Sequence, residues 1–151
     1  STGIIIRVSG VRIPAPPLIM KKNILILIYS FLIISCSTNS YHDISYYDNG
    51  FKQYDIQYKN EKIDGVARYW DSNGNLINEV NYVNDKFHGK WIDYYPNGNI
   101  LHIINYDYGK KHGEEIWYYK SGNIKSRVTY EYDQIVSDML RWDYTGKIIN
   151  E

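Results

Sequence analysis

The stretch YYPNGNI, from Tyr94 to Ile100, joins two aromatic residues, an Asn-Gly dipeptide and the start of an apolar run. Asn-Gly between two apolar runs is a strong short-range signal for a β-hairpin. Similar stretches occur at 69–76 (YWDSNGNL) and at 118–124 (YYKSGNI). Because the pattern recurs within 151 residues, the sequence predicts a row of hairpins.

The recurrence has a strict period of 24 residues, with units that begin at Tyr41, Gly65, Gly89, Gly113 and Ser137. A glycine stands nine residues into every unit, at Gly50, Gly74, Gly98, Gly122 and Gly146. Glycine adopts positive φ freely and asparagine tolerates it, so these positions predict tight hairpin turns of the Asn-Gly kind. We expect a second turn in each unit to close at the leading glycine, as at Gly89 and Gly113.

Large aromatic residues form two further series at fixed positions of the unit. Five residues into each unit stand Tyr46, Trp70, Tyr94, Tyr118 and Trp142. Seventeen residues into each complete unit stand Tyr58, Tyr82, Tyr106 and Tyr130. At constant strand spacing, each series predicts one row of aromatic side chains across a sheet.

The residues between these landmarks alternate between apolar and polar, as half-buried strands require. In the second strand of a unit, we expect positions such as Leu76, Val80 and Tyr82 to share one face. Because successive residues of a strand point to opposite faces, we expect Trp91 and Trp117 to project from the face opposite the aromatic residue five positions into their units. The sequence therefore predicts an all-β domain at 41–151, a single-layer antiparallel meander of stacked hairpins with about ten strands.

Residues 20–35 have the layout of a secretory signal, with Lys21 and Lys22 before an apolar run at 24–34 that is too short to span a membrane as a helix. The sequence Ile-Ile-Ser-Cys at 33–36 resembles a bacterial lipobox, which implies cleavage before Cys36 and lipidation of Cys36. Cys36 is the only cysteine, so it has no disulfide partner in the chain. We expect a short linker at 36–40 and a lipid anchor in a bacterial cell envelope, with the outer membrane preferred in a Gram-negative host. An ordinary secretory signal is the alternative.

Residues 1–19 show neither apolar periodicity nor turn chemistry, and they precede the Met20 that opens the signal. The tetrapeptide Val-Arg-Ile-Pro at 11–14 can be encoded by bases that resemble the T-loop of a transfer-RNA gene. We interpret residues 1–19 as a non-native upstream extension. The DNA upstream of codon 20 tests this interpretation.

The charge of the remaining chain argues against some partners. The whole sequence has 17 basic and 17 acidic residues, and without Arg7, Arg12, Lys21 and Lys22 there remain 13 basic against 17 acidic, a net charge of about −4. Nucleic-acid binding depends on Lys and Arg that neutralise phosphates. We therefore expect no nucleic-acid partner.

The sequence contains no phosphate-binding loop, nucleophile elbow or metal-ligand spacing. His88 and His112 share a repeat position, but two strand spacings, about 10 Å, exceed the reach of one zinc ion. We interpret them as turn residues that face solvent. Glu114 and Glu115 would need a desolvated site for acid–base catalysis, and a flat sheet offers none. We expect no enzyme activity, no cofactor and no metal site.

Together these landmarks resemble the bacterial variant of the MORN repeat, G-x-W-x-x-Y-x-x-N-G-x-I followed by a Tyr and a Gly-Lys turn. The segment GKWIDYYPNGNILHIINYDYGKKHG, from Gly89 to Gly113, matches this pattern best, and the resemblance covers 41–151. Proteins built this way are often grouped with YwqK-type toxin–antitoxin antitoxins. The resemblance implies an elongated, curved single-layer sheet used for binding or scaffolding.

We therefore expect a membrane-anchored scaffold whose sheet binds a partner protein or another copy of itself. The candidate binding surface comprises both aromatic rows together with Trp91 and Trp117. Aromatic faces with polar edges also suit a cell-wall or surface glycan. An antitoxin or immunity-like protein that neutralises a toxin by direct binding is a further alternative.

Overall fold

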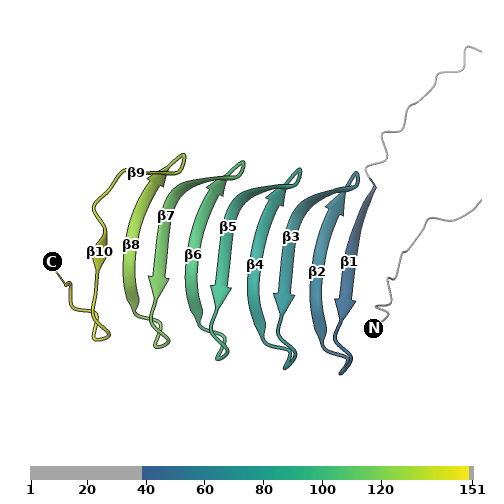
Figure 1. Cartoon of the computed structure of the whole chain (residues 1–151), viewed down its shortest axis with the longest axis horizontal. Helices are drawn as coiled ribbons and strands as arrows, with labels where there is room; N and C mark the ends of the chain where they lie inside the picture. The colour runs from purple at the N-terminus through teal and green to yellow at the C-terminus, as the bar shows by residue number, and fades with distance from the viewer. Residues whose placement is uncertain (1–38, 150–151) are drawn as a thin grey trace, which may run out of the picture.

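The computed structural model describes residues 39–149, which form ten β-strands in one sheet (Figure 1). Every pairing is antiparallel. Their bounds are β1 (Ser40–Tyr46), β2 (Lys52–Lys59), β3 (Lys62–Trp70), β4 (Leu76–Val83), β5 (Lys86–Tyr94), β6 (Ile100–Asp107), β7 (Lys110–Tyr118), β8 (Ile124–Glu131), β9 (Gln134–Ile135) and β10 (Leu140–Arg141).

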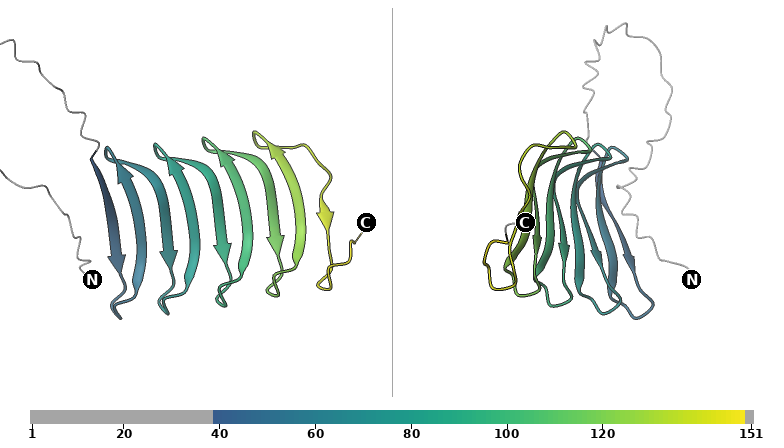
Figure 2. Two further views of the ribbon diagram at one scale, coloured as in Figure 1. Left: turned by 180° about the vertical axis from the view of Figure 1, so that it is seen from behind. Right: turned by 60° about the vertical axis from the view of Figure 1, so that its left-hand side comes forward.

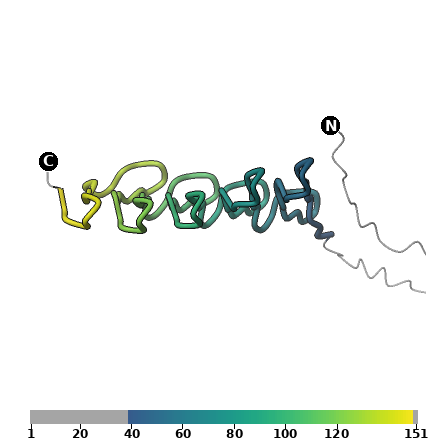
Figure 3. Tube along the Cα trace, turned by 90° about the horizontal axis from the view of Figure 1, so that it is seen from below, coloured from purple at the N-terminus to yellow at the C-terminus, as the bar shows by residue number. Residues whose placement is uncertain are grey.

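The strands follow one another across the sheet in chain order from β1 to β8, and both β9 and β10 pair with β8. Figure 2 shows the strands as one curved layer, and no other part of residues 39–149 packs on either face. Seen from below in Figure 3, the hairpins lie one behind another in a single row. The predicted single-layer meander is confirmed. Within residues 39–149 there is no helix long and apolar enough to cross a membrane.

The turns at the upper edge of Figure 1 contain two residues each. Asn84 and Asp85 have φ of 49° and 66°, and the corresponding residues of the other upper turns are also at positive φ. Two successive residues at positive φ define the type I′ turn, whose twist matches that of the flanking strands. This edge therefore carries the tight turns, and Asp85 rather than Gly89 completes one of them. The expectation that the second turn closes at the leading glycine is wrong.

The turns at the lower edge contain five residues, as at 95–99 between β5 and β6. The Gly98 N–H donates to the Tyr95 carbonyl at 2.9 Å, and the Tyr95 N–H donates to the Asn99 carbonyl at 2.8 Å. Gly98 has a φ of 84°, whereas Asn97 keeps a negative φ. The glycines predicted for turns are confirmed there, but in a turn that ends on a left-handed glycine and not in a tight Asn-Gly turn.

The leading glycine of a unit lies inside a strand, where it bends the sheet. Between β4 and β5, Val80 is opposite Trp91 and Tyr82 is opposite Phe87, so the β5 segment around Gly89 (φ 89°) bulges. Phe87 and Trp91 are four residues apart, about 13 Å in a straight strand. Their ring centroids are 5.1 Å apart, so the strand bends toward the face that carries them. We call this the concave face.

The last unit departs from this geometry at Ser137. Where the earlier units have Gly65, Gly89 or Gly113 at positive φ, this unit has serine, for which that conformation is costly. The strand is interrupted there and its pieces are β9 and β10, separated by residues 136–139. The bulge glycine is therefore what allows one strand to bend without breaking.

A continuous row of register-paired residues, the central row, crosses the concave face from β2 to β8: Ile56, Ala67, Val80, Trp91, Ile104, Glu115 and Val128. Its small and aliphatic members on β3, β4, β6 and β8 are at most 4% exposed and form the core. Leu76 and Ile100 do not join it, because a bulge shifts them into register with Trp70 and Tyr94. The expected common face of Leu76, Val80 and Tyr82 is therefore wrong at Leu76.

Candidate functional site

Beside the central row lies a second row of register-paired residues on the same concave face, which we call the polar row. It runs across seven strands: Tyr54, Tyr69, Asn78, Asp93, His102, Trp117 and Ser126. Residues two apart on a strand share a face, so the polar row and the central row are neighbours. The polar row differs in chemistry from strand to strand, unlike the aliphatic core beside it.

The middle of the polar row holds a buried charged cluster on β5, β6 and β7. His102 places Nδ1 3.1 Å from Oδ2 of Asp93 and Nε2 3.0 Å from Oε1 of Glu115. His102 and Glu115 are each 8% exposed. The indole N–H of Trp91 donates to Oδ1 of Asp93 at 3.0 Å, and Nζ of Lys111 lies 3.4 Å from Oε2 of Glu115. The cluster thereby joins three strands through side chains.

Both carboxyl groups of the cluster are stabilised as carboxylates. Burial raises the pKa of Asp93, but hydrogen bonds from His102, Trp91 and Asn78 outweigh it, and its pKa lies below the usual 3.8. Burial likewise raises the pKa of Glu115, and hydrogen bonding to His102 together with the Lys111 charge brings it below 4.5. An ionised carboxylate only accepts hydrogen bonds, and the His102 ring lies between two such acceptors on different strands.

An exposed indole adjoins this cluster. The ring of Trp117 stacks on that of His102 with centroids 4.0 Å apart and an interplanar angle of 22°. Trp117 is 39% exposed, so the other side of its ring is accessible. Trp91, which projects from the same face, is half-buried. Its flat apolar surface beside buried hydrogen-bonding groups can hold a ligand in a defined orientation.

The predicted tyrosine row lies on the concave face, on the other side of the central row. Phe87 packs between Tyr82 and Tyr106, with centroids 5.1 Å and 5.2 Å away. Trp91 also contacts this group, 5.1 Å from Phe87. Burial raises the pKa of Tyr82 and of Tyr106. These rings mainly pack against one another and stabilise the bend at Gly89.

The other predicted aromatic row lies on the opposite, convex face. The strand register places Trp70 and Tyr94 there. There Nζ of Lys52 lies 5.4 Å from the Trp70 ring centroid. Residues of this row are half-buried except Tyr46, which is 47% exposed. The eleven residues predicted to form one binding surface are thus divided between two faces. Tyr58, Tyr82, Tyr106, Tyr130, Trp91 and Trp117 share the concave face, and Tyr46, Trp70, Tyr94, Tyr118 and Trp142 do not.

Residues 63–84, 87–108 and 111–132 each match the family model of the MORN repeat variant. The chain contains MORN repeats. The three matched segments coincide with the hairpins β3–β4, β5–β6 and β7–β8, and they are 24 residues apart. A search of curated protein sequences finds no match to the chain.

The two histidines at equivalent positions of successive MORN repeats are not simply solvent-facing. The His88 ring lies 4.6 Å from that of Tyr108, and the His112 ring lies 4.7 Å from that of Tyr132. In both, Nδ1 is buried without a hydrogen bond of good geometry, although Nδ1 of His88 lies 3.3 Å from Oδ1 of Asp107. Each histidine therefore covers a tyrosine of the following upper turn. Among residues 39–149, no group of three or more His, Cys, Asp or Glu side chains is arranged to hold a metal ion.

The sequence pattern indicates Glu115 only as a neighbour of Glu114, and it does not single out Asp93 or His102. The structure separates the two glutamates, since Glu115 joins the central row and Glu114 lies next to Arg127, 3.5 Å from its guanidinium nitrogen. The expectation that the sheet offers no desolvated carboxylate is also wrong, because the sheet curves around Glu115. A detectable signal did exist, namely that position four of the unit varies (Tyr69, Asp93, Trp117) beside the aromatic residue that recurs at position five. The predicted lipidation residue Cys36 lies outside the described residues.

Proposed function

We propose that this MORN-repeat chain is a non-enzymatic scaffold that binds a partner protein along the polar row of its concave face. MORN repeats are generally non-enzymatic and commonly bind proteins or membranes. The observation that carries the proposal is the juxtaposition of the accessible Trp117 ring with the buried Asp93–His102–Glu115 cluster. Tryptophan is among the residue types that contribute most to the binding energy of protein interfaces.

The dimensions of the polar row favour an elongated partner segment. Seven strands about 4.8 Å apart give the row a length of roughly 29 Å. Tyr54 and Tyr69 at one end have ring centroids 6.5 Å apart, and Trp117 lies toward the other end. An extended polypeptide of eight or nine residues has about this length. Its side chains would meet aromatic surface at both ends and hydrogen-bonding groups in the middle.

We propose further that lipidation of Cys36 holds the scaffold at a bacterial membrane. β1 begins at Ser40, four residues after Cys36, and four extended residues span at most about 14 Å. A lipid at Cys36 would therefore keep the sheet near the membrane surface. The partner would then itself be a protein of the envelope, or a second copy that pairs with the open edge of β1.

A glycan is the second candidate ligand, and the exposed Trp117 favours it. An accessible indole can stack on the apolar face of a sugar ring, and Ser126, its register partner, offers a hydroxyl group. Titration of the protein with cell-wall oligosaccharides, followed by Trp fluorescence, distinguishes this candidate. Saturable quenching that is lost in Trp117→Ala would establish glycan binding.

The test of the main proposal is crosslinking in intact cells, followed by purification from the membrane fraction. The wild type is compared with Trp117→Ala on the concave face, with Trp70→Ala on the convex face as the matched control, and with Cys36→Ala. We expect a defined partner protein to co-purify with the wild type and with Trp70→Ala, and much less of it to co-purify with Trp117→Ala. With Cys36→Ala, we expect no complex in the membrane fraction. Equal capture by Trp117→Ala would contradict a concave site, and membrane retention of Cys36→Ala would contradict the anchor.

A further inference from the structure

The lower turns of successive repeats are connected by side-chain hydrogen bonds. At three of the four joints a tyrosine six residues into the unit donates its hydroxyl to a backbone carbonyl of the next unit: Tyr47 to Trp70 (2.9 Å), Tyr95 to Tyr118 (2.9 Å) and Tyr119 to Trp142 (2.8 Å). An asparagine amide reinforces each joint: Asn49 to the Ser72 carbonyl (2.6 Å), Asn99 to Lys120 (2.9 Å) and Asn123 to Tyr144 (2.9 Å). Each turn is thereby connected to the next.

The joint between the β3–β4 turn and the β5–β6 turn is different, because Asp71 stands where the others have tyrosine. Its Oδ1 accepts the N–H groups of Asn73 (2.9 Å) and Asn75 (2.8 Å), and its Oδ2 accepts the Asn75 side-chain amide (2.9 Å). The asparagine that should reach the next turn is therefore held in its own turn. Among the residues described, no side chain donates to the carbonyl of Tyr94 or Pro96, the counterparts of the acceptors at the other joints.

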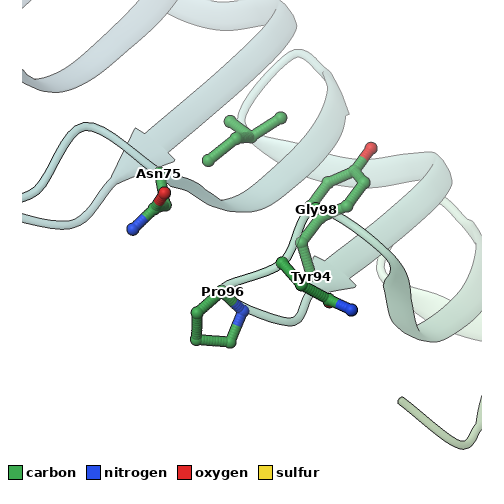
Figure 4. A pocket seen from close by; sticks show the side chains of 6 residues that line it. Asn75, Tyr94, Pro96 and Gly98 are labelled. Carbon is green, nitrogen blue, oxygen red and sulfur yellow. The ribbon is translucent and has the colours of Figure 1, made fainter. Parts of the chain in front are cut away.

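A pocket of about 430 Å³ opens at this joint, lined by Asn75, Leu76, Tyr94, Pro96, Asn97 and Gly98. Figure 4 shows Asn75 on one side and Tyr94 and Pro96 on the other. Leu76, Tyr94 and Pro96 provide apolar walls that suit a flat ring. The Asn75 and Asn97 amides also line the pocket, and both already donate, to the Asp71 carboxylate and to the Lys120 carbonyl. The backbone carbonyls of Tyr94 and Pro96 receive no side-chain donor among the described residues.

We propose that this joint is a receptor site for a tyrosine side chain of a partner polypeptide. The ring would pack against Leu76, Tyr94 and Pro96, and its hydroxyl would donate to the Tyr94 carbonyl as Tyr47 does to that of Trp70. The charge of the site selects for this occupant. Phenylalanine offers no donor to the acceptors, and the dianion of a phosphotyrosine is repelled by Asp71.

The ionised state of Asp71 supports this selection. Hydrogen bonds from the Asn75 side chain and backbone and from Asn73 lower the pKa of Asp71, so that it is a carboxylate at neutral pH. The site is distinct from the polar row, since Leu76 and Tyr94 belong to the convex face. It therefore offers a second point of attachment for a partner that curls around the lower edge of the sheet.

The test uses p-cresol as a probe for the tyrosine side chain and toluene as the same ring without the hydroxyl. The full chain is labelled with ¹⁵N and titrated while its amide resonances are followed. We expect p-cresol to shift the amides of Leu76, Asn97 and Gly98 and to bind about tenfold more tightly than toluene, the effect of one hydrogen bond. Equal affinities, shifts centred elsewhere, or no shifts at millimolar p-cresol would overturn the proposal. Binding of p-tolyl phosphate as tightly as p-cresol would also overturn the proposal.

Matched variants locate the site. Asp71→Tyr gives this joint the chain's own tyrosine and should abolish the p-cresol shifts at Leu76 and Gly98. Asp143→Tyr makes the same change at the equivalent position of the last unit and should leave them intact. Leu76→Ala removes one wall and should weaken p-cresol binding at least threefold, which keeps the test decisive if Asp71→Tyr does not fold. Undiminished p-cresol binding by a folded Asp71→Tyr, or by Leu76→Ala, would refute the site.

Discussion

The Nε2 atom of His102 lies 3.0 Å from a carboxylate oxygen of Glu115, and both residues are 8% exposed. With Asp93 on the other ring nitrogen, His102 lies between two carboxylates, and residues 39–149 form no second layer that would cover them. Buried polar groups are tolerated only when their hydrogen bonds are satisfied, and here they are. The cluster therefore holds β5, β6 and β7 in one geometry beneath the accessible ring of Trp117.

His102→Phe should destabilise the fold. The change removes the hydrogen-bonding partner of two carboxylates, and leaving a buried charged group without its hydrogen bond costs about 3 kcal/mol. Asp93 retains some solvent contact, which reduces the cost on its side. Urea unfolding measures the change, with His112→Phe as the control for a half-buried histidine that makes no such bonds. If both variants lost the same stability, the cluster would have no special structural role.

The unfolding free energy should fall as the pH is lowered through the acid range. The folded-state pKa values of Asp93 and Glu115 lie below their usual 3.8 and 4.5. The stability that these carboxylates contribute is therefore fully present above about pH 4.5 and is lost as the pH falls through the folded values. Urea unfolding between pH 3 and pH 7 measures this. The double variant Asp93→Asn/Glu115→Gln should show a shallower slope, and an unchanged slope would rule out these two groups as its source.

Alanine substitution at two glycines should distinguish backbone strain from loss of space. Gly109 has a φ of 93°, and a Cβ added there would have no atom within 4 Å, so Gly109→Ala should cost only the strain, about 1 kcal/mol. At Gly65 the added carbon would lie 2.1 Å from Oε1 of Gln57, which accepts the Val66 N–H. Gly65→Ala should cost about 1 kcal/mol more, because that hydrogen bond is lost. Thermal unfolding of both variants checks the order, and equal losses would contradict it.

Tyr119→Phe should weaken the joint between the fourth and fifth units. Its hydroxyl donates to the Trp142 carbonyl at 2.8 Å, and loss of one such bond costs about 1 kcal/mol. Hydrogen exchange should show faster exchange for the Trp142 and Gly146 amides, with the amides of β3 and β4 unaffected. Exchange that rises evenly over the whole sheet would indicate that the bond acts on global stability and not on this joint.

The fold was predictable from the sequence because a 24-residue period fixes many positions at once. Glycines such as Gly98 and aromatic residues such as Tyr106 recur in register, and few architectures other than stacked hairpins satisfy that spacing. The turn types were not predictable in the same way. Asn97-Gly98 suits a tight type I′ turn, but the loop is a five-residue turn because only the glycine takes positive φ. The bulge at Gly89 likewise looks in the sequence like the end of a turn.

The candidate site was less predictable than the fold. Parity correctly placed Trp117 opposite Tyr118, but it could not show that the sheet bends around Glu115 and buries it. The link between Asp93, His102 and Glu115 depends on register across three strands, which a single bulge can shift. Residues that vary beside a recurring one, such as Asp93 and Trp117 next to the aromatic residue at position five, were the available signal.

The most direct measurement is site-specific photo-crosslinking in intact cells from two neighbouring positions of β8. A photoreactive amino acid at position 126 lies in the polar row of the concave face, and one at position 127 lies on the convex face. We expect a single protein to crosslink from position 126, not from position 127, and to be lost when Trp117→Ala is added. Crosslinking of the same protein from position 127 alone, or equally from both positions, would contradict a partner-binding concave face.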